Sequence, residues 1–136
     1  MILRGKKNYK AISLNYLRDA DVANLVFDIT KRETFDLIES WLKELQDTNK
    51  SDISKILIGN KEDLENERLI STEKAEELAE TMKCKYFEAS AKTGKNVIEA
   101  LDEIARITFN DYINSNRVES FVLCREEKKK ILLMIF

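Results

Sequence analysis

The chain has 136 residues, of which 43% are hydrophobic and 35% charged, and its 23 basic and 25 acidic residues give a net charge of −2. This is the composition of one globular domain, and the balanced charge excludes the strongly basic surface typical of nucleic-acid binding. The chain has no histidine, which excludes histidine-based acid–base catalysis and histidine-ligated metal. Its two cysteines are too few for a disulfide framework or a zinc site. We therefore expect a reduced, cytoplasmic protein without a signal peptide or a transmembrane segment.

Apolar periodicity predicts helices alternating with strands from residue 9 to about residue 113. A helix over Tyr9–Leu17 precedes a strand over Ala23–Ile29. Thr30-Lys31-Arg32-Glu33 then has the pattern of a capping box, in which the threonine and glutamate side chains each bond to a backbone amide of the other residue. The helix that this box opens has apolar residues at helical spacing: Phe35, Ile38, Trp41, Leu42 and Leu45.

The second half of the chain continues this alternation. A polar loop over Asp47–Asp52 leads to a strand over Ile53–Gly59, a helix over about Thr72–Met82 and a strand over Lys85–Ala89. A last helix is expected to turn these side chains inward: Val97, Leu101, Ile104, Ala105, Thr108 and Tyr112. Such alternation predicts an α/β fold, with three parallel strands, a candidate fourth at Ile2-Leu3, and helices on both faces of the sheet.

The segment from Ser115 onward differs in character. Arg125–Lys130 is a charged run, and Ile131–Phe136 is wholly apolar. We expect residues 115–136 to be a poorly ordered C-terminal extension. A short membrane-contacting tail is the alternative, although six apolar residues would bind a surface weakly and fall far short of the roughly 20 that a span needs.

Ligands of parallel α/β sheets bind at the carboxyl ends of the strands, which here precede the loops at Asp28–Thr30, Asn60–Asp63 and Ser90–Lys92. Asn60-Lys61-Glu62-Asp63 directly follows an apolar strand. A carboxylate such as that of Asp63 can accept two adjacent N–H donors at once. A solvated turn is the simpler alternative for four polar residues.

A second motif, Glu88-Ala89-Ser90-Ala91-Lys92, follows the next strand. By itself it could be a strand-to-helix loop capped by Thr93. Two such motifs in this order, each at a strand end, disfavour an unrelated α/β domain with chance matches. Together they resemble the guanine-specificity elements of the Ras superfamily of small GTPases. Val26–Thr30 and Tyr9–Ala20 are similar to Rab proteins in particular.

The resemblance implies a fragment of the three-layer, P-loop-NTPase-like G domain over residues 1–114. It assigns guanine binding to the two loops, with the Ala91 N–H donating to guanine O6 and the Lys61 stem covering the base. It also implies GTP or GDP as ligand, Mg²⁺ as the family's metal, effector and regulator proteins as partners, and vesicle traffic at the cytosolic face of membranes as the setting. The predicted guanine-binding residues are Asn60, Lys61, Asp63, Ser90, Ala91 and Lys92.

Other parts of the family's machinery have no counterpart in these 136 residues. A phosphate-binding loop needs closely spaced glycines, whereas Gly5, Gly59 and Gly94 stand alone. Aligning Gly5 with the family's Asp-x-x-Gly-Gln element puts Ile2 at the Mg²⁺-linked aspartate and Lys6 at the catalytic glutamine. We therefore identify no catalytic residue, no metal ligand and no prenylation cysteines at the end of the chain, and we expect weak guanine-selective binding without GTP hydrolysis. A non-enzymatic protein-interaction module that keeps the back half of the fold is the alternative.

The same resemblance predicts an exposed sheet edge. The family's first strand would pair beside Ala23–Ile29, so without it the backbone of that strand is unpaired on one side. The apolar segment Ile131–Phe136 could fold back over this edge. We expect a poorly soluble, self-associating chain, with Leu101 and Ile104 losing burial.

Overall fold

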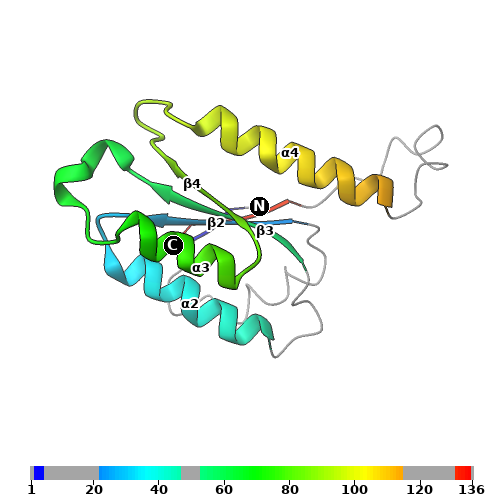
Figure 1. Cartoon of the computed structure of the whole chain (residues 1–136), viewed down its shortest axis with the longest axis horizontal. Coiled ribbons are helices and arrows are strands. Elements are labelled where there is room, and N and C mark those ends of the chain that lie inside the picture. The colour runs from blue at the N-terminus through cyan, green and yellow to red at the C-terminus, as the bar shows by residue number, and fades with distance from the viewer. Residues whose placement is uncertain (1, 5–21, 47–52, 115–130, 136) are drawn as a thin grey trace.

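The structure is a computed structural model that describes residues 2–4, 22–46, 53–114 and 131–135. The described residues form five strands, three α-helices and one 3-10 helix (Figure 1). In chain order these are β1 (Ile2–Arg4), β2 (Val22–Asp28), α2 (Arg32–Gln46), β3 (Ser54–Asn60), η2 (the 3-10 helix, Glu62–Glu67), α3 (Thr72–Thr81), β4 (Lys85–Ala89), α4 (Val97–Asn114) and β5 (Ile131–Ile135).

All neighbouring strands of the sheet pair in parallel, in the order β1-β5-β2-β3-β4. The predicted α/β fold with a parallel sheet is thus confirmed, and β1 is the fourth strand suggested at Ile2-Leu3. The sheet is wider than predicted, because β5 adds a strand. The predicted helix over Tyr9–Leu17 and the loop over Asp47–Asp52 lie outside the described residues.

The sheet separates two helical layers (Figure 1). Helices α2 and α3 cover one face, to which alternate residues of β2 and β3 contribute, because successive side chains of a strand point to opposite faces. The main core lies here and consists of Ala23, Leu25, Phe27, Ile29, Phe35, Ile38, Trp41, Ile53, Leu57, Ile70, Ala75, Ala79 and Met82. The rings of Phe27 and Phe35 meet edge to face with centroids 5.1 Å apart, a favourable aromatic geometry.

Helix α4 covers the other face with only part of the predicted set of side chains: Ile104 is buried and Val97 and Thr108 are half-buried, while the side chain of Tyr112 lies outside the described residues. Ala100, Glu103 and Ile104 are buried, whereas Leu101 is 57% exposed and Ala105 is also exposed. The prediction that Leu101 and Ala105 point inward is therefore wrong, although Ile104 lies inward as expected. The buried side of α4 carries Glu103, whose carboxylate accepts from Lys85 of β4 at 3.0 Å. The exposure of Leu101 agrees with the separate expectation that it loses burial, whereas Ile104 stays buried.

The segment Ile131–Ile135 forms strand β5 within the sheet, so the expectation of a poorly ordered extension fails for these residues. β5 pairs with β2 from Val22 to Val26, the edge for which we expected no partner. The fold-back suggested for this segment is confirmed. An unpaired row of backbone groups beside buried side chains is costly, which gives β5 a physical reason to pair there.

The start of α2 also differs from the sequence prediction. The helix begins at Arg32, and the Thr30 hydroxyl donates to the Asp28 carboxylate at 2.6 Å instead of capping the helix. The Thr34 hydroxyl donates to the Lys31 carbonyl at 2.7 Å. The Thr30 N–H also donates to the same Asp28 oxygen, and these charge-assisted bonds hold Thr30 toward the end of β2 rather than toward the first turn of α2.

Candidate functional site

The predicted site residues gather at one end of the sheet, where three adjacent strands reach their carboxyl ends (Figure 1). Asp28 ends β2, Asn60 ends β3, and Ser90 directly follows β4. Parallel register places Asp28 beside Asn60, and Asn60 beside Ala89. Residues far apart in the sequence are thus brought into contact by the sheet itself.

Direct hydrogen bonds join the loops after β3 and β4. The Ser90 hydroxyl, which is fully buried, donates to Asp63 Oδ1 at 2.5 Å. The Ala91 N–H donates to Asn60 Oδ1 at 3.2 Å. Ser90 Oγ also accepts from the Thr93 N–H at 3.1 Å, which fixes the hydroxyl that orients Asp63. The two motifs predicted to act together are therefore one hydrogen-bonded unit.

Lys61 lies in the left-handed region, with φ 69°, at the start of η2. Its ammonium pairs with Asp28 Oδ2 at 2.6 Å, which ties the β3 loop to the end of β2. Burial would raise the pKa of Asp28, but hydrogen bonds from Lys61 and Thr30 outweigh it and leave the pKa below its ordinary value. The hydrogen bond with Asp28 raises the pKa of Lys61. Sequence reasoning placed Asp28 near the site but did not predict this pair.

Gly59 permits the close packing immediately before Asn60. A Cβ at this position would lie 2.5 Å from the Tyr86 hydroxyl and 3.1 Å from Ile29 Cγ2, closer than side chains pack. Gly94 is required for a different reason, because its φ of 81° is one that other residues rarely adopt. It lies in the turn that returns the chain from Ser90 to α4, where its N–H donates to the Ser90 carbonyl at 2.8 Å.

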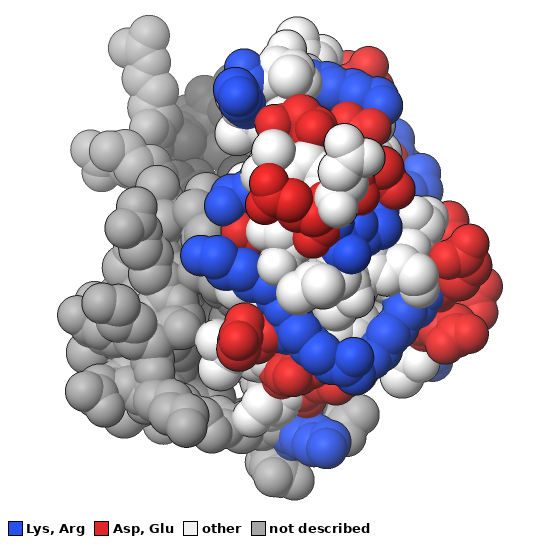
Figure 2. All heavy atoms as spheres, turned by 90° about the vertical axis from the view of Figure 1, so that its left-hand side faces the viewer, with Lys and Arg blue, Asp and Glu red and all other residues white. Residues whose placement is uncertain are grey.

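The remaining polar side chains of these loops form further bonds. Lys95 pairs with Glu62, which joins the loop before α4 to η2. Asn96 Nδ2 donates to the Glu88 carbonyl at 2.6 Å. Lys92 is exposed. Figure 2 shows this end of the molecule, where acidic and basic side chains of the described residues are interspersed without forming a patch of one sign.

A network behind the loops holds Glu88, the first residue of the second motif. Arg68 donates to both carboxylate oxygens of Glu88 at 2.8 Å, and the hydroxyls of Thr72 and Tyr86 donate to Oε1 at 2.8 and 2.9 Å. Burial would raise the pKa of Glu88, but these bonds, Arg68 first, leave it below its ordinary value. Sequence reasoning did not identify Arg68 and Tyr86. The sequence feature that could have pointed to them is Glu88 itself, because a charged residue at the end of a buried strand needs a partner.

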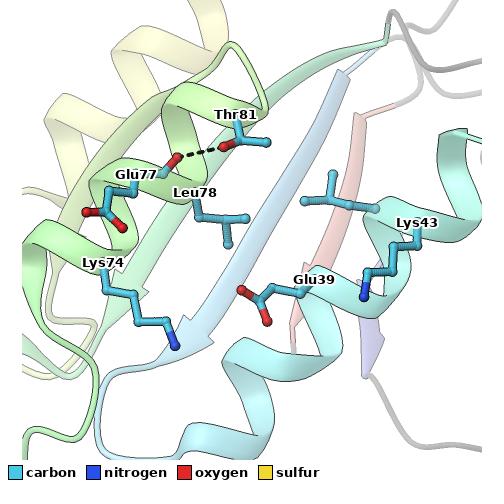
Figure 3. A pocket seen from close by; sticks show the side chains of 7 residues that line it. Glu39, Lys43, Lys74, Glu77, Leu78 and Thr81 are labelled. Atoms are coloured by element: carbon cyan, nitrogen blue, oxygen red, sulfur yellow. Dashed lines mark hydrogen bonds between the residues drawn. The ribbon is translucent and has the colours of Figure 1, made fainter.

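A groove of about 430 Å³ lies elsewhere, between α2 and α3 (Figure 3). It is lined by Glu39, Leu42, Lys43, Lys74, Glu77, Leu78 and Thr81. None of the predicted guanine-binding residues lines it. Its side chains mix both signs of charge with two leucines, and they come from helices rather than from the strand-end loops. We therefore place the candidate site at the loops, where buried and mutually bonded polar groups converge.

Among the described residues, no helix is long and apolar enough to cross a membrane. Within the same ranges, no three side chains of the metal-binding types (aspartate, glutamate, cysteine, histidine) come together as a site for a metal ion.

Comparison with known proteins agrees with this geometry. The Ras family sequence model matches residues 4–110, which include both guanine motifs. Rab-2B of Dictyostelium discoideum is 41% identical over 99 residues, covering 73% of this chain and 49% of that protein. RABA4a of Arabidopsis thaliana is 43% identical over 106 residues, covering 78% and 47%, and rat Rab-13 is 37% identical over 102 residues, covering 75% and 50%.

The chain spans about half the length of the curated relatives that it matches. The match nevertheless covers most of the chain and includes β2, β3, β4 and the loops that follow them. The chain belongs to the Ras family of small GTPases and is Rab-like.

Proposed function

We propose that the loops after β3 and β4 form a guanine-reading site, and that this chain binds guanine nucleotides weakly without hydrolysing GTP. The observation that carries this proposal is the hydrogen bond from buried Ser90 to Asp63 at 2.5 Å. It fixes one carboxylate in an exposed loop, as recognition of a planar base requires.

Asp63 supplies the discrimination between bases. Ser90 uses one lone pair of Oδ1, and within the described residues Oδ2 has no hydrogen-bond partner. The carboxylate can therefore accept the N1–H and N2–H donors of guanine side by side. Adenine offers no such pair of donors at these positions, so its binding would leave the carboxylate unsatisfied.

The Ala91 N–H is the proposed donor to guanine O6, and in this structure it donates to Asn60 Oδ1. An entering base must therefore replace or share an existing bond, so the net gain is smaller than one new hydrogen bond. Base contacts alone then support binding with a Kd on the order of millimolar, or roughly 4 kcal/mol.

The described residues do not fit the Mg²⁺ that assists the family's phosphoryl chemistry. Asp28, the most buried carboxylate at the site, is already bonded to Lys61 and Thr30 and so is not a free metal ligand. No glycine-rich loop is present in the sequence to hold phosphates. We therefore propose no hydrolytic step. By analogy with the family, we propose effector or regulator proteins as partners, at the cytosolic face of vesicle membranes.

Asp63→Asn tests the base-reading role. An asparagine amide donates where the carboxylate accepted, so it suits xanthine, which carries a carbonyl in place of the guanine 2-amino group. We expect Asp63→Asn to lose GDP binding and to gain binding of xanthosine diphosphate, both measured by ligand-observed NMR at millimolar concentration. Glu67→Gln, which also removes one negative charge from η2, should leave GDP binding unchanged.

Equal binding of GDP and ADP by the parent chain would contradict the proposal and favour the interaction-module alternative. So would an Asp63→Asn chain that binds GDP as well as the parent does. Hydrolysis is tested separately: Mg²⁺-dependent release of phosphate from GTP that disappears in Asp63→Ala would show that the chain retains catalysis.

A further inference from the structure

Strand β5 occupies an interior position of the sheet. It pairs in parallel with β1, from Ile2↔Leu133 to Arg4↔Ile135, and with β2, from Val22↔Ile131 to Val26↔Ile135. An interior strand bonds to its neighbours along both edges, so β5 completes the backbone of β1 and of β2 at once.

The β2 side of this position is the more demanding of the two. Val22, Ala23 and Leu25 are fully buried there, and Asn24 is nearly so. The side-chain Oδ1 of Asn24 already lacks a hydrogen-bond partner within the described residues. Without β5, backbone groups of β2 would lose their partners in the same buried surroundings, where unpaired polar groups are costly.

The backbone directions identify which groups these are. The Ile29 N–H donates to the Asn60 carbonyl of β3. Because amides alternate sides along a strand, those of Phe27 and Leu25 also face β3, whereas those of Val26 and Asn24 face β5. Loss of β5 should therefore affect every second amide of β2 and leave the others paired.

We propose that the space between β1 and β2 is an acceptor slot for one extended apolar strand in parallel register, with residues Ile131–Ile135 of this same chain as its exchangeable occupant. The register pairs carry the first part of the proposal. The exchange follows from the small extent of the pairing, because β1 contributes only Ile2–Arg4 and β2 only five register pairs. Strand addition of this kind rests mainly on backbone hydrogen bonds, so a free peptide of the same sequence can compete.

Met134→Pro tests the slot in the full chain, with Met134→Leu as its matched control. Met134 pairs with Leu3 of β1 and Leu25 of β2. In parallel register its amide and carbonyl face β2, on the side of Asn24 and Val26, so proline there removes a bond between β5 and β2. We expect amide exchange at Asn24 and Val26 to speed up roughly ten-fold or more, while Leu25 and Phe27 keep their protection. Met134→Leu keeps the amide and an apolar side chain, so it should match the parent.

A peptide spanning residues 128–136, whose three lysines favour solubility, tests exchange directly. Added to the Met134→Pro chain, during refolding if that chain precipitates, it should restore slow exchange at Asn24 and Val26 in a saturable manner. The same peptide carrying Met134→Pro should not do so.

Three results would overturn the proposal. The first is unchanged protection of Asn24 and Val26 in Met134→Pro. The second is a parent chain in which mixed isotope labelling shows β5 of one copy against β2 of another, since the slot would then be filled by a second copy. The third is failure of the wild-type peptide to restore any protection, which would contradict the exchange.

Discussion

The two faces of the sheet are built differently. The face under α2 and α3 is closed, with Leu25 and Leu57 fully buried beneath two helices. The face under α4 has one helix, and that helix buries small or charged residues, Ala100 and Glu103, together with Ile104. The outer side of α4 exposes large apolar side chains: Ile98 at 68%, Leu101 at 57% and Phe109 at 62%.

The difference shows where the stability of this chain resides. Apolar burial contributes about 25 cal/mol per Å² removed from water, so the closed face supplies most of the driving force. The α4 face buries little apolar surface from its helix, because large apolar side chains of α4 remain exposed. We therefore expect substitutions of the same type to have large effects on the first face and small effects on the second.

Truncation of a leucine on each face gives the largest contrast. Leu25→Ala removes a fully buried side chain and should lower the free energy of unfolding by about 3 kcal/mol, whereas Leu101→Ala should lower it by less than about 1 kcal/mol. Urea denaturation measures both. If Leu25→Ala does not fold, Ile29→Val on the same face should still cost about 1 kcal/mol. Equal losses from Leu25→Ala and Leu101→Ala would mean that the outer side of α4 is covered in solution.

Removal of an arginine on each face gives the next contrast. Arg68 is 14% exposed and holds Glu88 through both of its oxygens, so Arg68→Ala strands a half-buried carboxylate and should cost about 2 kcal/mol. Arg106 pairs with Glu103 from a largely exposed position, so Arg106→Ala should leave the urea midpoint almost unchanged. A larger loss from Arg106→Ala than from Arg68→Ala would reverse the comparison.

Acid should weaken the fold through the carboxylates of both faces. The pKa of Glu88 is lowered in the folded state, so its contribution to stability is complete above the ordinary glutamate pKa of about 4.3 and is lost as the pH falls. Hydrogen bonds from Arg106 and then Lys85, outweighing burial, also lower the pKa of Glu103. Between pH 6 and pH 3, the free energy of unfolding should depend less on pH in Glu88→Gln than in the parent chain, and the reduction should be smaller in Glu103→Gln. An unchanged pH dependence in Glu88→Gln would show that the network is not maintained in solution.

The smallest effect on stability is expected at the outer side of α4. Leu101→Glu places a charge among exposed apolar side chains, so it should raise solubility and reduce self-association while changing the free energy of unfolding by less than about 0.5 kcal/mol. Light scattering against protein concentration measures the first and urea denaturation the second. A matched Asp102→Asn, beside it on the helix, should not improve solubility. Unchanged scattering in Leu101→Glu would place the self-associating surface elsewhere.

Much of the fold was predictable because its signals are local. β2, β3, β4 and the helices α2 and α3 follow apolar runs and helical spacing in the sequence, and the structure places each within a residue or two of its predicted bounds. The rotation of α4 was not predictable in this way. Its apolar spacing favoured Leu101, whereas the buried side includes Glu103, which pairs with Lys85 from another element.

The site shows the same division. The residue types of the two loops were readable from the sequence, because the proposed base recognition uses a carboxylate and a backbone donor at strand ends. The bonds between loops were not, since Lys61–Asp28 and Arg68–Glu88 join segments that only the folded sheet brings together. The position of Ile131–Ile135 in the sheet was also not predictable, because an apolar run does not indicate which strand it pairs with.

The position of β5 has a consequence for how the chain reaches its native state. Val22 pairs with Ile131, so the two residues are separated by 131 − 22 = 109 positions in the sequence. β5 is synthesised after every other described element, yet it lies next to the strand at the centre of the sheet. Contacts this distant form slowly because a large loop must close first. During synthesis the side of β2 that β5 covers therefore has to wait for residues 131–135, and a growing chain that exposes an apolar strand edge for longer is more prone to misassembly.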